Sequence, residues 1–465
     1  MKKILFISLA AILVLGIALA GCDGGGGGVA APNSIKVGAV RDLDTDFAFY
    51  DQFAGGPTYR GWNKTINDAG GIYMSKYNKN LTIEMIIRDY DMFSMADLQT
   101  QTEYLITVKK VHFMLGAPGT TTIYTQAAVC DAYGIILMTL EGGATDMMLE
   151  PGKLDSWSNT FINLNFANWY QIPVLYEMLK EQTLAQNRTS PKAYVIYMDN
   201  EFGEEYLNTT ITQFSAANVT AVSHTFLCPQ ATIDTLINNA KTAFGNASDP
   251  NYDIFCAYTY DPDLPKVITA MDSFDFDPPA IMMGPGAESG AYAFLYADGK
   301  NLTGICGFGV ANEKSEVAPE TVTMSFADMW DIITPLGTVP WCPVNYTWSC
   351  WAQPPMWAGL EMLTKAIETV GHLDVGYTSA VRNVMVSFNS TNPCTTVLGD
   401  TWYHVLGGGL GGGVIDYQCL PGQLCQWQNN YTEIVGYSTV TSDIPKYCAT
   451  SSFWYPMTGN WSWLS

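Results

Sequence analysis

The residue types that most often carry chemistry are sparse or unfavourably spaced in this chain. Only four of the 465 residues are histidine, and the 11 cysteines form no Cys-x-x-Cys pair, so the usual spacing of a zinc site is missing. No Gly-x-Ser-x-Gly or His-Glu-x-x-His motif occurs, which argues against a serine hydrolase or a zinc protease. The paired acids Glu204 and Glu205 are more simply the solvated start of a helix. The sequence therefore predicts no enzyme, no metal site and no cofactor.

One cysteine is placed for covalent modification. Two lysines precede an apolar run, Ile4 to Ala20, which is shorter than the roughly 20 residues of a membrane-spanning helix and predicts a secretory signal. Leu19-Ala20-Gly21-Cys22 resembles a lipobox, after which the cysteine is lipidated. Residues 1–21 are then a lipoprotein signal peptide, Cys22 is the lipid anchor and residues 22–33 are a glycine-rich tether. The alternative is a plain signal peptide, or an uncleaved anchor, with a chance cysteine.

The other cysteines and the asparagines agree with export. Ten cysteines remain besides the lipobox cysteine, an even number that permits disulfide pairing outside the cell. Cys342/Cys350 and Cys419/Cys425 are near enough in sequence to close small loops, whereas Cys130 is expected as a small buried residue on a helix. Asn-x-Ser/Thr triplets are possible glycan acceptors, although composition alone can produce them. They begin at Asn63, Asn80, Asn187, Asn208, Asn218, Asn246, Asn301, Asn345, Asn389, Asn430 and Asn460.

Length and charge limit the class of protein. The chain is long enough for two or three domains, and its 48% of hydrophobic residues can form large cores. Its net charge of −22 repels phosphate backbones, which argues against nucleic acid as a partner. The same charge disfavours non-specific contact with an anionic membrane. Past Cys22, no apolar run is long enough to cross a bilayer.

Strand and helix patterns alternate twice along the chain. Strands are expected at 35–40, 81–87, 111–115 and 135–140, and again at 193–197, 219–226, 253–258 and 280–283. Helices are expected at 59–69, 96–110, from the loop 116–122 to 133, and at 203–217, 233–244, 265–274, 351–370 and 378–387. Alternating strands and helices predict parallel, doubly wound sheets. The break near residues 161–169 divides them into two α/β lobes, an architecture that can close on a small ligand.

Five segments sharpen this interpretation through their order and spacing. They are Ile66-Asn-Asp-Ala-Gly-Gly-Ile72, Ile87-Arg-Asp-Tyr-Asp91, Val195-Ile-Tyr-Met-Asp-Asn-Glu-Phe-Gly203, Tyr260-Asp-Pro-Asp263 and Gly422-Gln-Leu-Cys-Gln-Trp-Gln428. The chain resembles the substrate-binding proteins of branched-chain amino-acid-type ABC transporters from about Ile35 to Trp463. The resemblance is thin between Trp330 and Gly413.

The resemblance implies the type I periplasmic-binding fold. That fold has two doubly wound Rossmann-like lobes, a ligand cleft between them and three chain crossings, here expected near residues 164, 311 and 413. Lobe 1 is then formed by residues 34–164 and 312–413, and lobe 2 by residues 165–311 and 414–465.

The resemblance also implies ligand contacts from lobe 1, at the carboxyl ends of strands. Tyr50 matches a cleft tyrosine of the family. Thr120 and Thr121 match a loop whose hydroxyl and backbone N–H groups hold a ligand carboxylate or amide at a helix N-terminus. Simple N-capping is the alternative for these threonines. The charges at Arg41, Asp42, Asp44 and Asp46 face either the cleft or solvent.

A third loop replaces the family's small residues and threonine with Glu141, Gly142 and Gly143. Glu141 is expected to receive a ligand ammonium or an arginine such as Arg41, unless it points outward and the glycines only turn the chain.

Lobe 2 is expected to contribute Phe202, Tyr260 and Gly286. The two aromatic rings match cleft positions where a ring packs on the ligand, with packing inside the lobe as the alternative. Gly286 stands where amino-acid binders of the family often carry an acid, and Glu288 is displaced from that position. This departure argues against an ordinary α-amino acid unless Glu141 compensates. An amide, a urea-like compound or a carboxylate is the alternative ligand.

The expected function is that of a solute-binding lipoprotein on the outer face of the cell membrane. It would capture a small polar ligand, such as an amino acid, an amide or a related compound, for the permease of an ABC transporter. The alternatives are a ligand-sensing component of a surface receptor and a glycosylated structural surface protein.

Overall fold

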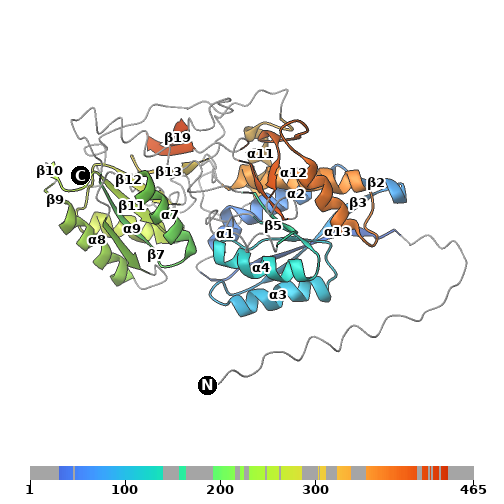
Figure 1. The fold of residues 1–465 in the computed structure, drawn as a ribbon, viewed down its shortest axis with the longest axis horizontal. Helices are drawn as coiled ribbons and strands as arrows, with labels where there is room; N and C mark the ends of the chain where they lie inside the picture. Colours follow the sequence, from blue (N-terminus) through green and yellow to red (C-terminus); the bar gives the residue numbers. More distant parts are fainter. Residues whose placement is uncertain are drawn as a thin grey trace, which may run out of the picture. The chain divides into compact units, whose positions relative to one another are not determined.

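The computed structural model describes residues 31–45, 48–139, 157–163, 192–214, 220–224, 230–246, 249–260, 263–284, 302, 304–309, 322–336, 352–405, 411–416, 419, 423–428 and 431–437. Two sheets, one of eight strands and one of seven, form the framework of these residues (Figure 1). The predicted signal peptide, Cys22, Glu141, Gly142, Gly143 and Gly286 lie outside them.

The first sheet has the strand order β16-β17-β6-β5-β4-β1-β3-β2. Its central strands are parallel, and only the edge strands β2 and β16 run antiparallel to their neighbours. The bounds are β1 Ser34–Arg41, β2 Ile72–Met74, β3 Lys79–Asp89, β4 Phe113–Leu115, β5 Ile136–Thr139, β6 Thr160–Ile162, β16 Tyr403–Val405 and β17 Gly413–Ile415. Strands from two distant stretches of the chain therefore share one sheet.

Helices cover both faces of the first sheet (Figure 1). On one side α3 packs against α4, and on the other α12 packs against α2 and α13, with α11 also against α2. The bounds are α1 Ala48–Phe53, α2 Gly55–Asp68, α3 Met95–Thr107, α4 Thr120–Ala132, α11 Phe326–Ile333, α12 Gln353–Val370 and α13 Tyr377–Ser387. Short pieces complete this part: the 3-10 turns Ser75–Tyr77 and Thr334–Leu336, and the hairpin of β14 Cys394–Thr396 with β15 Gly399–Thr401.

The second sheet has the order β19-β18-β13-β12-β11-β7-β8. Five strands are parallel, and β18 and β19 add an antiparallel edge. The strands are β7 Ala193–Met198, β8 Thr220–His224, β11 Ile254–Tyr258, β12 Ile281–Gly284, β13 Cys306–Gly309, β18 Gln423–Gln428 and β19 Tyr431–Tyr437. The helices are α7 Glu201–Gln213, α8 Gln230–Phe244 and α9 Leu264–Ser273, and a small hairpin pairs β9 Gly245–Asn246 with β10 Asp249–Pro250.

The sequence of the central strands explains why they are central. In β1 the side chains of Ile35, Val37, Ala39 and Val40 are all fully buried. A strand covered by helices on both faces carries a nearly continuous apolar run, in contrast to the alternation of a half-exposed strand. The predicted α/β class with doubly wound sheets is confirmed.

The buried cysteines argue against the expectation that the ten cysteines form a disulfide framework. Cys130, Cys256, Cys306 and Cys394 are buried free thiols, so they do not contribute to a disulfide framework. Cys130 lies on α4, as a small buried residue, as expected. Burial raises the pKa of the Cys256 thiol to about 12, which keeps it protonated and unreactive. Cys342 and Cys350 lie outside the described residues.

In the part of the chain that the structure describes, no helix has both the length and the apolar character needed to span a membrane.

Candidate functional site

A pocket of about 210 Å³ is formed by segments that follow four parallel strands. Residues 92–95 come after β3, residues 119–122 after β4, Met198 and Asn200 at the end of β7, and Tyr260 after β11. Open α/β sheets bind ligands at this carboxyl edge. The lining residues are Met92, Phe93, Met95, Gly119, Thr121, Thr122, Met198, Asn200 and Tyr260. The pocket thus draws on the loops of both sheets.

The N-terminus of α4 opens onto this pocket. The residue at the N-cap is Gly119, which has no side chain to cap the helix, so neither Thr120 nor Thr121 is the N-cap. Thr120 is almost fully buried, and the Thr121 hydroxyl donates a hydrogen bond to Glu201 Oε2 at 3.0 Å. The first N–H groups of a helix lack intrahelical partners and carry the positive end of its dipole. This end of α4 can therefore hold a negatively charged or carbonyl-bearing group.

The hydroxyl of Thr122 is engaged by the loop itself. Its Oγ lies 2.5 Å from Gly119 O and 2.6 Å from Pro118 O, which holds the turn that leads into α4. Gly119 has φ +99°, a conformation that side-chain-bearing residues rarely adopt. A Cβ atom there would lie 3.4 Å from the hydroxyl oxygen of Tyr260, in contact with it. The backbone conformation at the start of α4 therefore requires glycine, and a side chain there would also contact Tyr260.

The two predicted aromatic residues lie together. The rings of Phe202 and Tyr260 stack with centroids 5.2 Å apart and 29° between their planes. Tyr260 lines the pocket, whereas Phe202 is 4% exposed and is not among the lining residues. Phe202 also packs on Tyr206, whose ring in turn contacts Tyr258. This aromatic layer fixes the position of Tyr260.

The predicted first loop is held by buried charge. Arg41 is 1% exposed, and its Nε donates to Asp51 Oδ1 at 3.0 Å while its Nη1 donates to Gly116 O at 3.2 Å. Arg60 Nη1 also donates to Asp51, at 3.4 Å. These bonds connect the end of β1, helix α1 and the start of the loop that leads to α4. Tyr50 lies in α1, beside Asp51.

Asp42 is buried too, and it positions part of the pocket. Its carboxylate accepts hydrogen bonds from the Thr45 backbone and hydroxyl and from the Met92 N–H. Asp44 is exposed, and Asp46 lies outside the described residues. Carboxylate oxygens of Asp42, Asp44 and Asp89 lie within 4.8 Å of one another. Since the oxygens of Asp42 already accept bonds from the protein, this cluster gives no reason to assign a metal.

Sequence reasoning missed several lining residues. Met92, Phe93 and Met95 follow the strand end that carries the Ile87–Asp91 segment, and Met198 and Asn200 lie inside the Val195–Gly203 segment. Phe93 is 55% exposed. The available signal was the group of apolar side chains shortly after the carboxyl end of a strand, where open α/β sheets place their ligand loops.

Comparison with known proteins places these observations in context. Residues 34–312 match the family model described as periplasmic binding protein. No match is found among the curated proteins.

Solved structures of similar fold include three transport proteins. The substrate-binding protein LivJ of Streptococcus pneumoniae, in complex with isoleucine, is 14% identical with a TM-score of 0.63, covering 87% of this chain and 99% of its own. A solute-binding protein of an R. palustris ABC transporter, in complex with benzoate, is 15% identical with a TM-score of 0.64, and the match covers 90% of this chain and 98% of that protein. The leucine-binding protein LivK of Thermotoga maritima is 10% identical with a TM-score of 0.59, and the match covers 87% of this chain and 98% of that protein.

Proposed function

The chain belongs to the periplasmic binding protein family, and we propose that it captures a small solute in the 210 Å³ pocket and delivers it to an ABC permease. The family consists of solute-binding proteins and not of enzymes. The volume is below the roughly 300–1,000 Å³ of pockets for drug-sized ligands, which favours a small solute.

The observation that supports this proposal most directly is the convergence of α4 and Tyr260 on one pocket. The N-terminus of α4, with Thr121 among the lining residues, contributes to the pocket from the first sheet, and Tyr260, stacked on Phe202, contributes to it from the second. We assign Thr121 to the polar end of the ligand, together with the backbone N–H groups of the first turn of α4, to which the buried Thr120 belongs. We assign Tyr260 to its packing, with Phe202 as support.

The chemistry of the lining favours a ligand with one acidic or amide end and an apolar body. The α4 N-terminus suits a carboxylate or a carbonyl oxygen. Met92, Phe93, Met95 and Met198 supply apolar and polarisable surface. Isoleucine and benzoate, which appear in the similar structures, both have this plan. An amino acid, an amide or a small carboxylate remains the proposed ligand class.

Five further residues belong to the proposal because they stand at ligand-contacting positions of the family, although four of them depart from the family's usual residue types. They are Tyr50, Glu141, Gly142, Gly143 and Gly286, at the loops that surround a cleft in the family. Glu141 is proposed to receive an ammonium group where the ligand carries one.

The cellular setting is proposed from the sequence. The lipobox supports anchoring through Cys22 on the outer face of the cell membrane, with residues 22–33 as a tether. We propose two lobes, residues 34–164 with 312–413 and residues 165–311 with 414–465. Ligand binding would shift the equilibrium between their open and closed arrangements.

The test is to identify what the purified mature protein carries. Mass spectrometry after denaturation would reveal a co-purified solute, and thermal-shift titration would compare it with amino acids, amides and short acids. We expect one solute class to raise the melting temperature with concentration, because a ligand that binds only the folded state stabilises it.

A matched pair of variants locates the binding. Tyr260→Ala is expected to abolish the shift while the fold persists, and Tyr133→Ala, at an exposed ring outside the pocket, is expected to leave it unchanged. No released solute and no shift with any compound would contradict the proposal and favour a structural surface role.

A further inference from the structure

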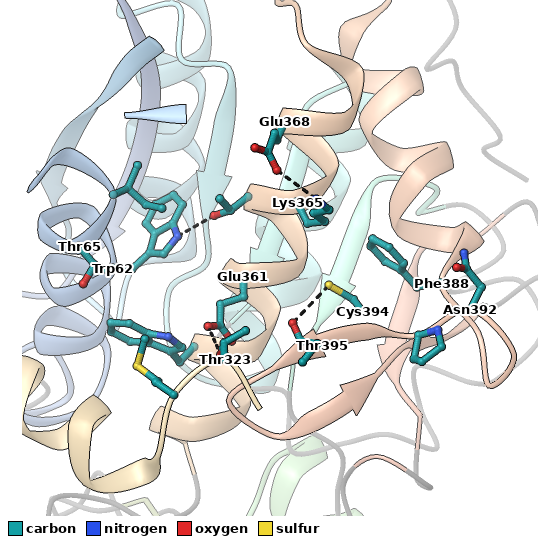
Figure 2. Close-up of a pocket in the computed structure, with 15 residues that line it drawn as sticks. Trp62, Thr65, Thr323, Glu361, Lys365, Glu368, Phe388, Asn392, Cys394 and Thr395 are labelled. Carbon is teal, nitrogen blue, oxygen red and sulfur yellow. Dashed lines mark hydrogen bonds and ion pairs between the residues drawn. The ribbon is translucent and has the colours of Figure 1, made fainter. Parts of the chain in front are cut away.

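A second, larger pocket lies within the part of the chain that forms the first sheet and its helices. Its volume is about 540 Å³, and it shares no lining residue with the pocket at α4. Figure 2 shows Trp62 of α2, Glu361 and Lys365 of α12, and Cys394 and Thr395 of β14 around it. The proposed solute site does not use this pocket, so an inference about it stands apart from that proposal.

The walls of this pocket are aromatic and held in place. Trp62 and Trp357 are 2% and 1% exposed, and they lie on two helices that pack against each other, α2 and α12. Trp62 Nε1 donates to Thr364 Oγ1 at 2.9 Å, which fixes the indole (Figure 2). Met324 and Phe388 add apolar surface. A pocket with such walls removes an apolar ligand body from water.

One acidic group sits among these walls. Glu361 accepts hydrogen bonds from Thr323 Oγ1 at 2.6 Å and from the Val397 N–H at 2.7 Å, one on each carboxyl oxygen. The side chain of Trp357 also favours the charged form of Glu361, so of the roughly four acceptor positions of an ionised carboxylate about one remains for a ligand. Burial raises the pKa of Glu361 to about 7, although the hydrogen bonds to its carboxylate act in the opposite direction.

The other ionisable groups that line the pocket do not neutralise the charge of an ionised Glu361. Lys365 and Glu368, on the next turns of α12, form an ion pair at 3.1 Å on the exposed rim. Burial raises the pKa of the Cys394 thiol on β14 to about 12, so it stays neutral. On α2 the lining residues are Trp62, Thr65 and Ile66, which carry no charge at neutral pH.

We propose that this pocket is a second ligand site that binds an organic cation with an aromatic or branched apolar body. Its ammonium group lies on the Glu361 carboxylate, and its body lies against the walls formed by α2, α12 and residues 388–395. Aromatic side chains attract cations through the negative faces of their rings. The net charge of −22 raises the local concentration of cations around the whole chain.

Calorimetric titration with two probes of one shape tests this site. Phenethylammonium and 3-phenylpropionate share an aromatic body and differ in the sign of their charge. We expect the unmodified mature protein to bind phenethylammonium and to bind 3-phenylpropionate at this pocket at least about tenfold more weakly. Failure of phenethylammonium to bind at millimolar concentration would overturn the proposal and leave the solute site untouched.

Three variants assign the bound probe to the pocket. Glu361→Gln keeps the size of the side chain and removes its charge, so the affinity for phenethylammonium is expected to fall at least about tenfold. Glu368→Gln, on the exposed rim, is the matched control and is expected to change it less than about threefold. Thr395→Trp fills the pocket from an exposed position and is expected to abolish binding. Full affinity in Glu361→Gln and Thr395→Trp, with loss in Tyr260→Ala, would place the probe in the solute pocket and refute the proposal.

The pH profile provides a second readout. Because Glu361 loses its proton near pH 7, the affinity of the unmodified protein for phenethylammonium should rise between pH 6 and pH 8. An amine stays protonated throughout this range. The profile should be flat in Glu361→Gln. A rise that persists in that variant would contradict the assignment.

Discussion

Thr121 joins two helices that belong to different sheets. Its hydroxyl donates to Glu201 Oε2 at 3.0 Å, so a residue of α4 is bonded to a residue of α7. Its backbone belongs to the first turn of α4, where N–H groups are available to a ligand. One side chain therefore contributes both to the proposed binding and to the contact between the helices. The two contributions can be separated by substitution.

Thr121→Ala is expected to lower ligand affinity about tenfold, because in the proposed complex the Thr121 hydroxyl turns from Glu201 and donates to the charged end of the ligand. The free energy of unfolding should fall by only about 1 kcal/mol. Thr121→Ser keeps the hydroxyl and should retain most of the affinity. Titration of the identified ligand, with chemical denaturation of each variant, measures both quantities. Equal affinities for the alanine and serine variants would remove this hydroxyl from the site.

At the scale of elements, the entry to α4 depends on a glycine between a strand and a helix. Gly119 combines φ +99° with ψ 150°, a combination essentially restricted to glycine. Gly134, just beyond the other end of α4, also has a positive φ, +65°, but nothing lies within 4 Å of a Cβ placed there. Gly119 and Gly134 thus differ in the backbone strain that a side chain would cause and in the atoms that its Cβ would contact.

Gly119→Ala is expected to destabilise the fold by about 1–3 kcal/mol and to weaken ligand binding, because a residue with a side chain is strained at this φ and ψ and the turn must move. Gly134→Ala is the matched control and should cost about 1 kcal/mol with no effect on binding. Urea denaturation and ligand titration of both variants check this. An unchanged affinity in Gly119→Ala would mean that the mouth of α4 does not contact the ligand.

The elements also show what could be predicted from the sequence. The long parallel strands and their helices were predicted to within a few residues; for example, β1 was expected at 35–40 and runs from Ser34 to Arg41. Several strands of two or three residues, such as β2 and β16, were missed because so short a run shows no periodicity, whereas β4, equally short, was found within the expected strand 111–115. Their place is set by pairing with distant strands.

The candidate site was predicted only in part, because its side chains are brought together from segments that are distant in the sequence. Thr121 and Tyr260 were found through segments at strand ends, and both line the pocket. Phe202 was expected just before the helix predicted at 203–217, whereas it lies in the first turn of α7, and the depth to which it is buried behind Tyr260 depends on tertiary packing. The Glu361 pocket was not predicted at all. It joins α2 to residues more than 250 positions later in the chain, and no local pattern reports such a contact.

At the scale of the whole molecule, the net negative charge affects how the protein can be held at a membrane. A chain with a net charge of −22 is not attracted to an anionic bilayer, so retention at a membrane needs a covalent anchor. A lipidated N-terminal cysteine followed by a glycine run provides one in the proposal made above. The charge would then hold the folded part away from the lipid surface.

Cys22→Ser is expected to move the protein from the membrane fraction to the soluble fraction of its expression host. Fractionation with labelled palmitate incorporation measures this, and Cys130→Ser, at a buried thiol, is the control that should change neither. Membrane retention of the Cys22→Ser protein would contradict the lipobox assignment.

The buried thiols offer a way to time the opening of each sheet. Cys130 lies on a helix of the first sheet, and Cys256 lies within the second. Both are fully buried and held in the protonated form, so an alkylating reagent can reach them only when the surrounding structure opens. The alkylation rate of each cysteine, followed by peptide mass, would therefore report the local unfolding of its own sheet. A bound solute that slows both rates equally would couple the two halves into one cooperative unit, whereas a solute that slows one rate would reveal which half carries the greater share of the binding energy.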